Sequence, residues 1–346
     1  MSKIEIKNVY KIFGDQPSKV LPMVKDGATK EEVLEKTGHT IGLDNVSLSI
    51  EEGETFVCMG LSGSGKSTLI RHINRLIDPT SGEVSVEGTN VMNLDQKQLI
   101  EFRRHKMSMV FQRFGLFPHK TVLENVGYGL EVQGQKPEER NKTAMEKIEA
   151  VGLNGFENQF PNQLSGGMQQ RVGLARALAT DSDIMLMDEA FSALDPLIRT
   201  DMQNILLELQ KELHKTIIFI THDLDEALRI GDNIAILRDG KVIQEGDPQD
   251  IIMNPADAYI TDFIKDINRS RVIELRSIID SKTKGTGTGL SYKMSVEEAL
   301  PLLNNAKSKS FAVVNEENKN IGSVNLDSAI KALARRDENA TSERYK

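Results

Sequence analysis

Short apolar runs alternate along most of the chain with longer segments in which apolar residues recur every three or four positions. The short runs predict strands, and they cover residues 5–13, 41–50, 54–60, 82–88, 106–112, 183–189, 215–221 and 233–246. The longer pattern predicts amphipathic helices, including those over 68–77 and 200–213. Alternation of this kind predicts an α/β domain whose central sheet is mainly parallel.

Two stretches depart from this alternation. An insertion over 15–40 separates the first two strands, and within it KEEVLEKTG predicts a short helix that ends at Gly38. Residues 113–163 are rich in helical patterns and lack clear strand runs. We expect residues 113–163 to form a helical subdomain that splits the α/β core.

The character of the chain changes after about residue 270. Residues 281–289, SKTKGTGTG, combine Gly, Thr and Lys without apolar periodicity, which indicates a linker or an exposed loop. We expect the linker between the two domains to cover 269–287. Beyond the linker, residues 288–336 predict a small α/β unit of a helix, two strands and a second helix. The last residues, 337–346, are expected to be frayed.

Composition narrows the class of protein. The chain has 346 residues, enough for two domains, and a formal net charge of -8, so no overall basic field would attract nucleic acid. Cys58 is its one cysteine, which excludes an intramolecular disulfide and fits a reducing compartment. The N-terminus lacks the apolar core of a signal peptide, and no apolar run approaches the roughly 18 residues that span a bilayer. We therefore expect a cytosolic protein or one docked on a membrane protein.

A glycine-rich loop carries the first chemical signal. GLSGSGKS, residues 60–67, follows the apolar strand TFVCM and opens a helix, which is the context that a P-loop requires. Glycines allow successive backbone N–H groups to surround an anion, and the helix start adds its positive dipole end. Lys66 can reach the β- and γ-phosphates, and the Ser67 hydroxyl can bind Mg²⁺. The expected ligand is therefore a nucleoside triphosphate.

Two further apolar strands end in candidate catalytic residues. Asp188 follows IMLM, at the carboxyl edge of a parallel sheet, where a carboxylate can hold Mg²⁺ beside the P-loop. Glu189 comes next and can orient and deprotonate the attacking water. His222 ends the strand TIIFIT, where an imidazole can contact the γ-phosphate and that water.

The stretch LSGGMQQRVGLARAL, residues 164–178, supplies a second helix start suited to phosphate. One nucleotide does not need two such cradles on one chain. The spacing therefore suggests that two chains face each other, each lending its second cradle to the P-loop of the other.

These motifs together resemble the ATP-binding subunits of ABC transporters over residues 3–268. The resemblance rests on GLSGSGKS, IMLMDE, the signature LSGGMQQ, the glutamine of MVFQ, the D-loop SALD and the histidine of ITHD. It implies a P-loop ATPase core with a mainly parallel sheet, an antiparallel β subdomain and a helical subdomain. It also implies a homodimer that closes around two Mg·ATP on the cytoplasmic face of the cell membrane.

The resemblance assigns roles to individual residues, with Glu189 and His222 as the catalytic pair. The residues expected to bind ATP within one chain are Phe13, Gly60, Leu61, Ser62, Gly63, Ser64, Gly65, Lys66, Ser67, Thr68 and Gln112. The residues expected to contact ATP in the other chain are Ser165, Gly166, Gly167 and Asp195. The residues expected at Mg²⁺ are Ser67, Gln112 and Asp188. Phe13 would stack on adenine, with Tyr10 as the less favoured candidate.

The motif DEAFSALDPLIR and the insertion over 15–40 resemble the subclass that imports glycine betaine and proline. That resemblance implies uptake of compatible solutes through a separate membrane subunit, which docks on the surface around RFGLFPHKTVLENV, and a substrate-binding protein. An importer of a different small solute, a soluble ABC ATPase and a regulatory module without turnover remain alternatives. Residues 288–336 resemble a single CBS motif, which implies either an adenine nucleotide site or a small dimerising domain.

Overall fold

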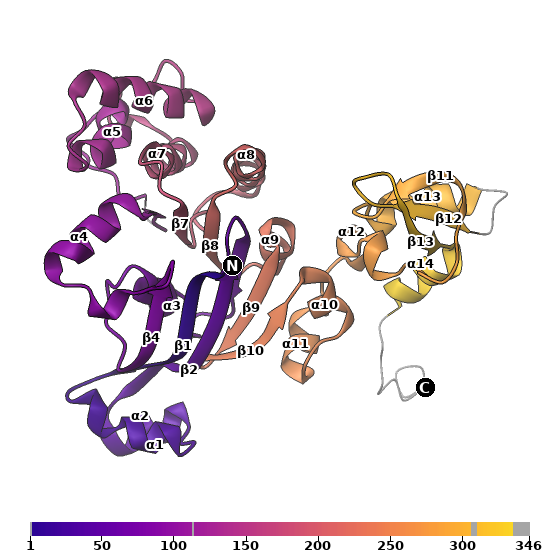
Figure 1. The fold of residues 1–346 in the computed structure, drawn as a ribbon, viewed down its shortest axis with the longest axis horizontal. Coiled ribbons are helices and arrows are strands. Elements are labelled where there is room, and N and C mark those ends of the chain that lie inside the picture. The colour runs from indigo at the N-terminus through magenta and orange to yellow at the C-terminus, as the bar shows by residue number, and fades with distance from the viewer. Residues whose placement is uncertain (1, 113, 306–309, 335–346) are drawn as a thin grey trace. The chain divides into compact units, whose positions relative to one another are not determined.

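The computed structural model describes residues 2–112, 114–305 and 310–334. It divides into two compact units, one up to Glu245 and one from Gly246 onward (Figure 1). Every residue predicted to bind or hydrolyse ATP belongs to the first unit.

A six-stranded sheet in the order β10-β9-β3-β8-β7-β6 forms the centre of the first unit. Its strands are β3 (Thr55–Met59), β6 (Met107–Val110), β7 (Ile184–Asp188), β8 (Thr216–Thr221), β9 (Asn233–Arg238) and β10 (Lys241–Gly246). The pairs from β9 through β3, β8 and β7 to β6 are all parallel. β3, β7 and β8 are buried along their whole length, which explains their continuous apolar runs. The predicted mainly parallel sheet is confirmed.

A second, antiparallel sheet in the order β2-β1-β4-β5 lies beside the first. Its strands are β1 (Ser2–Phe13), β2 (Thr40–Glu51), β4 (Ser81–Val86) and β5 (Thr89–Asn90). Helix α3 (Lys66–Ile73) packs against strands of both sheets. One core cluster joins Ile4 of β1, Phe56 of β3 and Ile70 of α3. The helix that begins at the P-loop is therefore held between two sheets.

The insertion folds into η1 (Pro17–Lys19), α1 (Leu21–Lys25) and α2 (Lys30–Thr37). Thr29 caps α2 through a reciprocal pair of hydrogen bonds with Glu32, and Gly38 ends it with a φ of 71°. Val33 of α2 is buried in a small cluster on the face of β1 that carries Tyr10. The predicted helix and its glycine stop are confirmed.

The predicted helical region is present and extends beyond its expected end at residue 163. Helices α5 (Val122–Val132), α6 (Pro137–Ala150) and α7 (Gly166–Ala179) pack against one another (Figure 1). The other helices of the first unit are η2 (Val91–Asn93), α4 (Gln96–His105), η3 (Pro161–Gln163), α8 (Pro196–Leu213) and α9 (Leu224–Ile230). Among the described residues, none of the helices is both long and apolar enough to cross a bilayer.

The second unit contains a three-stranded sheet in the order β11-β12-β13. Its elements are α10 (Pro248–Met253), α11 (Ala258–Phe263), α12 (Arg269–Val272), η4 (Leu275–Ser277), β11 (Thr286–Ser291), α13 (Val296–Asn305), β12 (Phe311–Val314), β13 (Asn320–Val324) and α14 (Leu326–Leu333). α13, β12, β13 and α14 follow one another in the predicted order of helix, strand, strand and helix. The prediction missed the strand β11, which begins within the loop expected over 281–289. The tail over 337–346 lies outside the described residues.

The expected linker over 269–287 is wrong, and the unit boundary lies near residue 245 rather than 268. Ile273 and Leu275 are fully buried within the stretch. The Gln249 side chain of α10 donates to the Val272 carbonyl at 2.9 Å and accepts from the Glu274 N–H at 2.9 Å. Ile273 and Leu275 anchor the first part of this stretch without an apolar period. The end of its Gly- and Thr-rich part enters β11, which pairs with β12 although its glycines and threonines give no strand signal.

Candidate nucleotide-binding site

The P-loop leaves β3 and enters α3, with glycines at the points where the backbone is crowded. Gly60 has a φ of 151°, and a side chain there would collide with the Leu237 carbonyl. A Cβ at Gly65 would lie 2.5 Å from the Gly42 carbonyl oxygen. The Ser64 hydroxyl is buried and has no hydrogen-bond partner among the described residues. An unpaired hydroxyl beside a helix N-terminus fits a phosphate oxygen as its partner.

Lys66 is buried and pinned to the loop that it follows. Its Nζ donates to the carbonyls of Gly60 at 2.8 Å and Leu61 at 2.9 Å, and it lies 3.9 Å from Glu189 Oε1. Burial lowers the pKa of Lys66, while the nearby Glu189 and Asp188 carboxylates act in the opposite direction. A desolvated ammonium held in one place can bind phosphate strongly, because little water competes for it.

Asp188 and Ser67 come together across the sheet edge, as the sequence predicts. The Ser67 hydroxyl donates to Asp188 Oδ1 at 2.8 Å, and Arg71 Nη2 lies 3.5 Å from Asp188 Oδ2. A hydroxyl and a carboxylate oxygen are ligands that Mg²⁺ uses alongside phosphates and water. Within the described part of the chain, no cluster of three or more His, Cys, Asp or Glu could hold a metal by itself. The pair therefore fits a nucleotide-dependent Mg²⁺ site rather than a closed protein cage.

Glu189 occupies the centre of the candidate catalytic group. Gln112 Nε2 donates to Glu189 Oε2 at 3.0 Å, and His222 Nδ1 lies 3.4 Å from the same oxygen. The Glu189 backbone has a φ of 45°, which is uncommon for a residue with a side chain. Its N–H donates to the Ile220 carbonyl at 3.1 Å, and its carbonyl accepts from the Ser192 hydroxyl at 2.9 Å. These bonds hold a strained backbone that aims the carboxylate at Lys66, a pattern found at functional sites.

The signature and the D-loop lie at the starts of two neighbouring helices. Ser165 caps α7 by accepting from the Met168 N–H, and Asp195 caps α8 by accepting from the Ile198 N–H at 3.1 Å. A Cβ at Gly167 would lie 2.5 Å from the Ile198 side chain, so the two helix starts are in close contact. Among the described residues, no hydrogen bond or ion pair joins these caps to residues 60–68 of the same chain. The structure thus brings the caps together with each other and not with the P-loop.

The structure separates the two candidates for the adenine contact. Tyr10 is buried in the cluster that the insertion covers, so its ring is committed to the core. Phe13, three residues later, has 39% of its surface exposed and packs beside Gly42, which itself adjoins Gly65 of the P-loop. Of the two rings, Phe13 is therefore the one that is exposed beside the P-loop, and its stacking on adenine stays a prediction.

One residue near the P-loop has no counterpart among the sequence predictions. Lys30 Nζ, from the first turn of α2, donates to the Gly63 carbonyl at 3.1 Å. This contact could not be predicted from the sequence, because 33 residues separate Lys30 from Gly63 and no motif links them.

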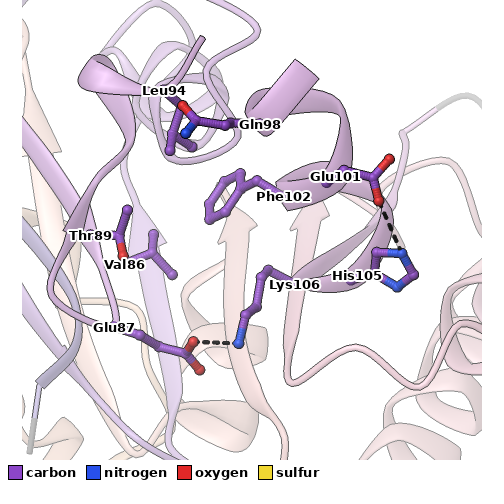
Figure 2. A pocket seen from close by; sticks show the side chains of 9 residues that line it. All are labelled: Val86, Glu87, Thr89, Leu94, Gln98, Glu101, Phe102, His105 and Lys106. Atoms are coloured by element: carbon purple, nitrogen blue, oxygen red, sulfur yellow. Dashed lines mark hydrogen bonds and ion pairs between the residues drawn. The ribbon is translucent and has the colours of Figure 1, made fainter. Parts of the chain in front are cut away.

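A cleft of about 390 Å³ lies elsewhere, between α4 and the strands β4 and β5. Figure 2 shows Phe102 directed into it, with Lys106 bonded to Glu87 and His105 near Glu101 at the rim. Its lining includes none of the residues predicted to bind ATP. The candidate nucleotide site therefore lies at the P-loop and not in this cleft.

Comparison with known proteins agrees with the geometry. The family model described as ABC transporter matches residues 43–192. The chain is 58% identical over 279 residues to the glycine betaine/carnitine transport ATP-binding protein GbuA of Listeria monocytogenes, covering 81% of this chain and 70% of that protein. It is 51% identical over 330 residues to the glycine betaine transport ATP-binding protein OpuAA of Bacillus subtilis, covering 95% of this chain and 78% of that protein.

A solved structure is similar over the ATPase core. The dimeric, post-hydrolysis structure of the ATP-binding cassette MJ0796, bound to ADP and Pi, matches with a TM-score of 0.60 and 37% identity. The match covers 71% of this chain and 98% of that one. Sequence relatives that span nearly the whole chain and a cassette with the same core agree with each other. This chain belongs to the family of ABC transporter ATP-binding subunits.

Proposed function

We propose that this chain is the ATP-hydrolysing subunit of an importer that takes up glycine betaine or a related compatible solute. The observation that carries the proposal is the meeting of Glu189 with Lys66, Gln112 and His222 at the P-loop. The solute class rests on the 51% identity, over 95% of this chain, with a glycine betaine transport ATP-binding protein. The chain would act at the cytoplasmic face of the membrane, bound to a separate membrane subunit that receives solute from a substrate-binding protein.

The catalytic residues divide the work of ATP hydrolysis. The N–H groups at the start of α3, the Ser64 hydroxyl and Lys66 would bind the β- and γ-phosphates. Glu189 would orient a water molecule and take its proton as the water oxygen forms a bond to the γ-phosphorus. The bond from that phosphorus to the β-phosphate oxygen breaks, which leaves ADP and inorganic phosphate. His222 would donate to the γ-phosphate oxygens and hold the water in line.

Mg²⁺ would be held by Ser67 and Asp188, with Gln112 as a third contact. The hydroxyl and carboxylate oxygens of Ser67 and Asp188 already lie together at 2.8 Å. Bound there, the ion would neutralise phosphate charge. Because Gln112 donates to Glu189, it would link the phosphate end of the site to the helical region that follows β6.

Two copies of the chain would close head to tail around two ATP molecules. Ser165, Gly166, Gly167 and Asp195 lie on the surface or at its edge, at the starts of α7 and α8. In the dimer, those helix starts would meet the γ-phosphate bound by the partner chain. The dimeric MJ0796 cassette, at 37% identity, supports this arrangement.

The membrane subunit would dock on the loop before α5. Asn125 is fully buried, and its side chain bonds the backbone of Phe117, Lys120 and Thr121. These bonds make the loop a rigid platform. The ring centroids of Phe117 and Tyr128 lie 4.4 Å apart, so the loop also packs against α5. A rigid surface can transmit closure of the dimer to a partner without dissipating it in loop motion.

Solute-dependent turnover tests the transport proposal. In vesicles carrying the complete transporter with this chain, glycine betaine added with the binding protein should stimulate ATP hydrolysis. The control is the same vesicles without solute, and proline and carnitine complete the panel. Stimulation by another solute alone would assign a different importer. Failure of this chain to copurify with any membrane subunit would contradict a role in transport.

The second unit offers a separate test of the CBS-like interpretation. We propose that α13, β12, β13 and α14 bind an adenine nucleotide. The full chain with Lys66→Ala should then still bind AMP in equilibrium dialysis, because AMP lacks the β- and γ-phosphates that the P-loop holds. Absence of AMP binding by both this variant and the wild type would favour a small dimerising domain instead.

A further inference from the structure

The carbonyl groups of the P-loop need donors of their own. A loop that turns its N–H groups toward phosphate turns its carbonyls outward, where each accepts a hydrogen bond from the protein or from water. The Lys66 ammonium donates to the carbonyls of Gly60 and Leu61, and the Gly240 N–H donates to the Ser64 carbonyl at 3.0 Å. The Gly63 carbonyl is bonded by a side chain from outside the core, the Lys30 ammonium, at 3.1 Å.

Lys30 is held in place by the local fold of the insertion. It is the first residue of α2, directly after the Thr29 cap, and Val33 anchors the next turn in a buried cluster. Residues 27–31 line one side of a cleft of about 290 Å³, opposite the hairpin of β9 and β10. The start of α2 is therefore anchored to the core through Val33, and the Lys30 side chain extends from it to the P-loop.

Most of the carboxylates near Lys30 are paired with other cations, so they do not draw its ammonium away from the P-loop. Three carboxylates line the same cleft, those of Glu31, Asp44 and Asp239. Asp44 pairs with Lys241 at 3.1 Å, and Asp239 pairs with Arg238 at 3.5 Å. Two of the three carboxylates thus have other cations as partners, and the Lys30 ammonium donates to the Gly63 carbonyl.

We propose that Lys30 is a positioning residue for nucleotide binding, which the insertion contributes to the P-loop. The peptide unit that joins Gly63 to Ser64 is held at both ends, by Lys30 at the Gly63 carbonyl and by the bond from the Ser64 N–H to the Leu61 carbonyl at 3.2 Å. Lys30 adds a second fixed positive charge, after Lys66, next to the phosphate cradle. This inference rests on the proposed ATP-binding function and gives the insertion a role at the site.

The test compares the wild type with Lys30→Ala, Lys30→Arg and a control, Lys36→Ala. Lys36 lies near the other end of α2, so its removal makes the same change in net charge on the same helix. Lys30→Ala should raise the KM for ATP by about three- to tenfold, with kcat changed less than about twofold, because a bond to a charged donor is lost. Lys30→Arg should recover most of the loss, and Lys36→Ala should match the wild type.

Binding of a fluorescent ATP analogue to the full chain provides a second readout, and thermal unfolding monitors the fold. An unchanged KM in Lys30→Ala would overturn the proposal. So would a fall in kcat that follows a lower melting temperature and is not recovered by arginine, since that pattern marks a structural role. If neither the wild type nor Lys36→Ala binds the analogue, the proposed ATP-binding function itself fails.

Discussion

Glu189→Gln is expected to lower ATP hydrolysis by at least about 100-fold, since general base catalysis contributes that much or more. Glutamine keeps the size of the side chain but cannot take a proton from water. The contacts that would bind the phosphates come from Lys66 and the loop, so ATP affinity should stay near that of the wild type. Closed dimers should therefore accumulate with Mg·ATP, as measured by size-exclusion chromatography with light scattering.

The matched control for this variant is Glu208→Gln, an exposed carboxylate on α8. It should hydrolyse ATP at the wild-type rate and show no accumulation of dimers. Rapid turnover by Glu189→Gln would assign the base to another residue. A variant that stays monomeric with ATP, both in solution and with its membrane partner, would contradict the shared two-chain site.

Lys66→Ala is expected to weaken ATP binding by about 10- to 100-fold, the loss of a strong charge-assisted hydrogen bond. The substitution also frees the Gly60 and Leu61 carbonyls, so the loop itself loses two of its bonds. Affinity for a fluorescent ATP analogue measures the effect directly, without dependence on turnover.

Lys211→Ala, on the exposed surface of α8, provides the control for removal of one lysine. Its ATP affinity and melting temperature should equal those of the wild type. ATP binding by Lys66→Ala at wild-type strength would mean that the loop does not bind the triphosphate in the way proposed here.

Most of the first unit was predictable because its signals are local. β3, β7 and β8 are wholly buried, so their sequences are continuous apolar runs that end at chemically active residues. Gly38 stops α2 because it adopts a left-handed conformation at low cost. Around Ile273 and Leu275 the same approach failed, since their anchoring depends on Gln249 from another helix and leaves no periodic pattern.

The sequence by itself determined the P-loop, the positions of Asp188 and Glu189 at a strand end, and the capped start of α7. Each of these depends on residues adjacent in the chain, whose backbone geometry and hydrogen bonding are set locally. Only the tertiary structure decided that Tyr10 is a core residue while Phe13 is exposed, and that Lys30 reaches Gly63. Those outcomes depend on which face of β1 the insertion covers. That choice is made by the packing of segments far apart in sequence, which no local pattern records.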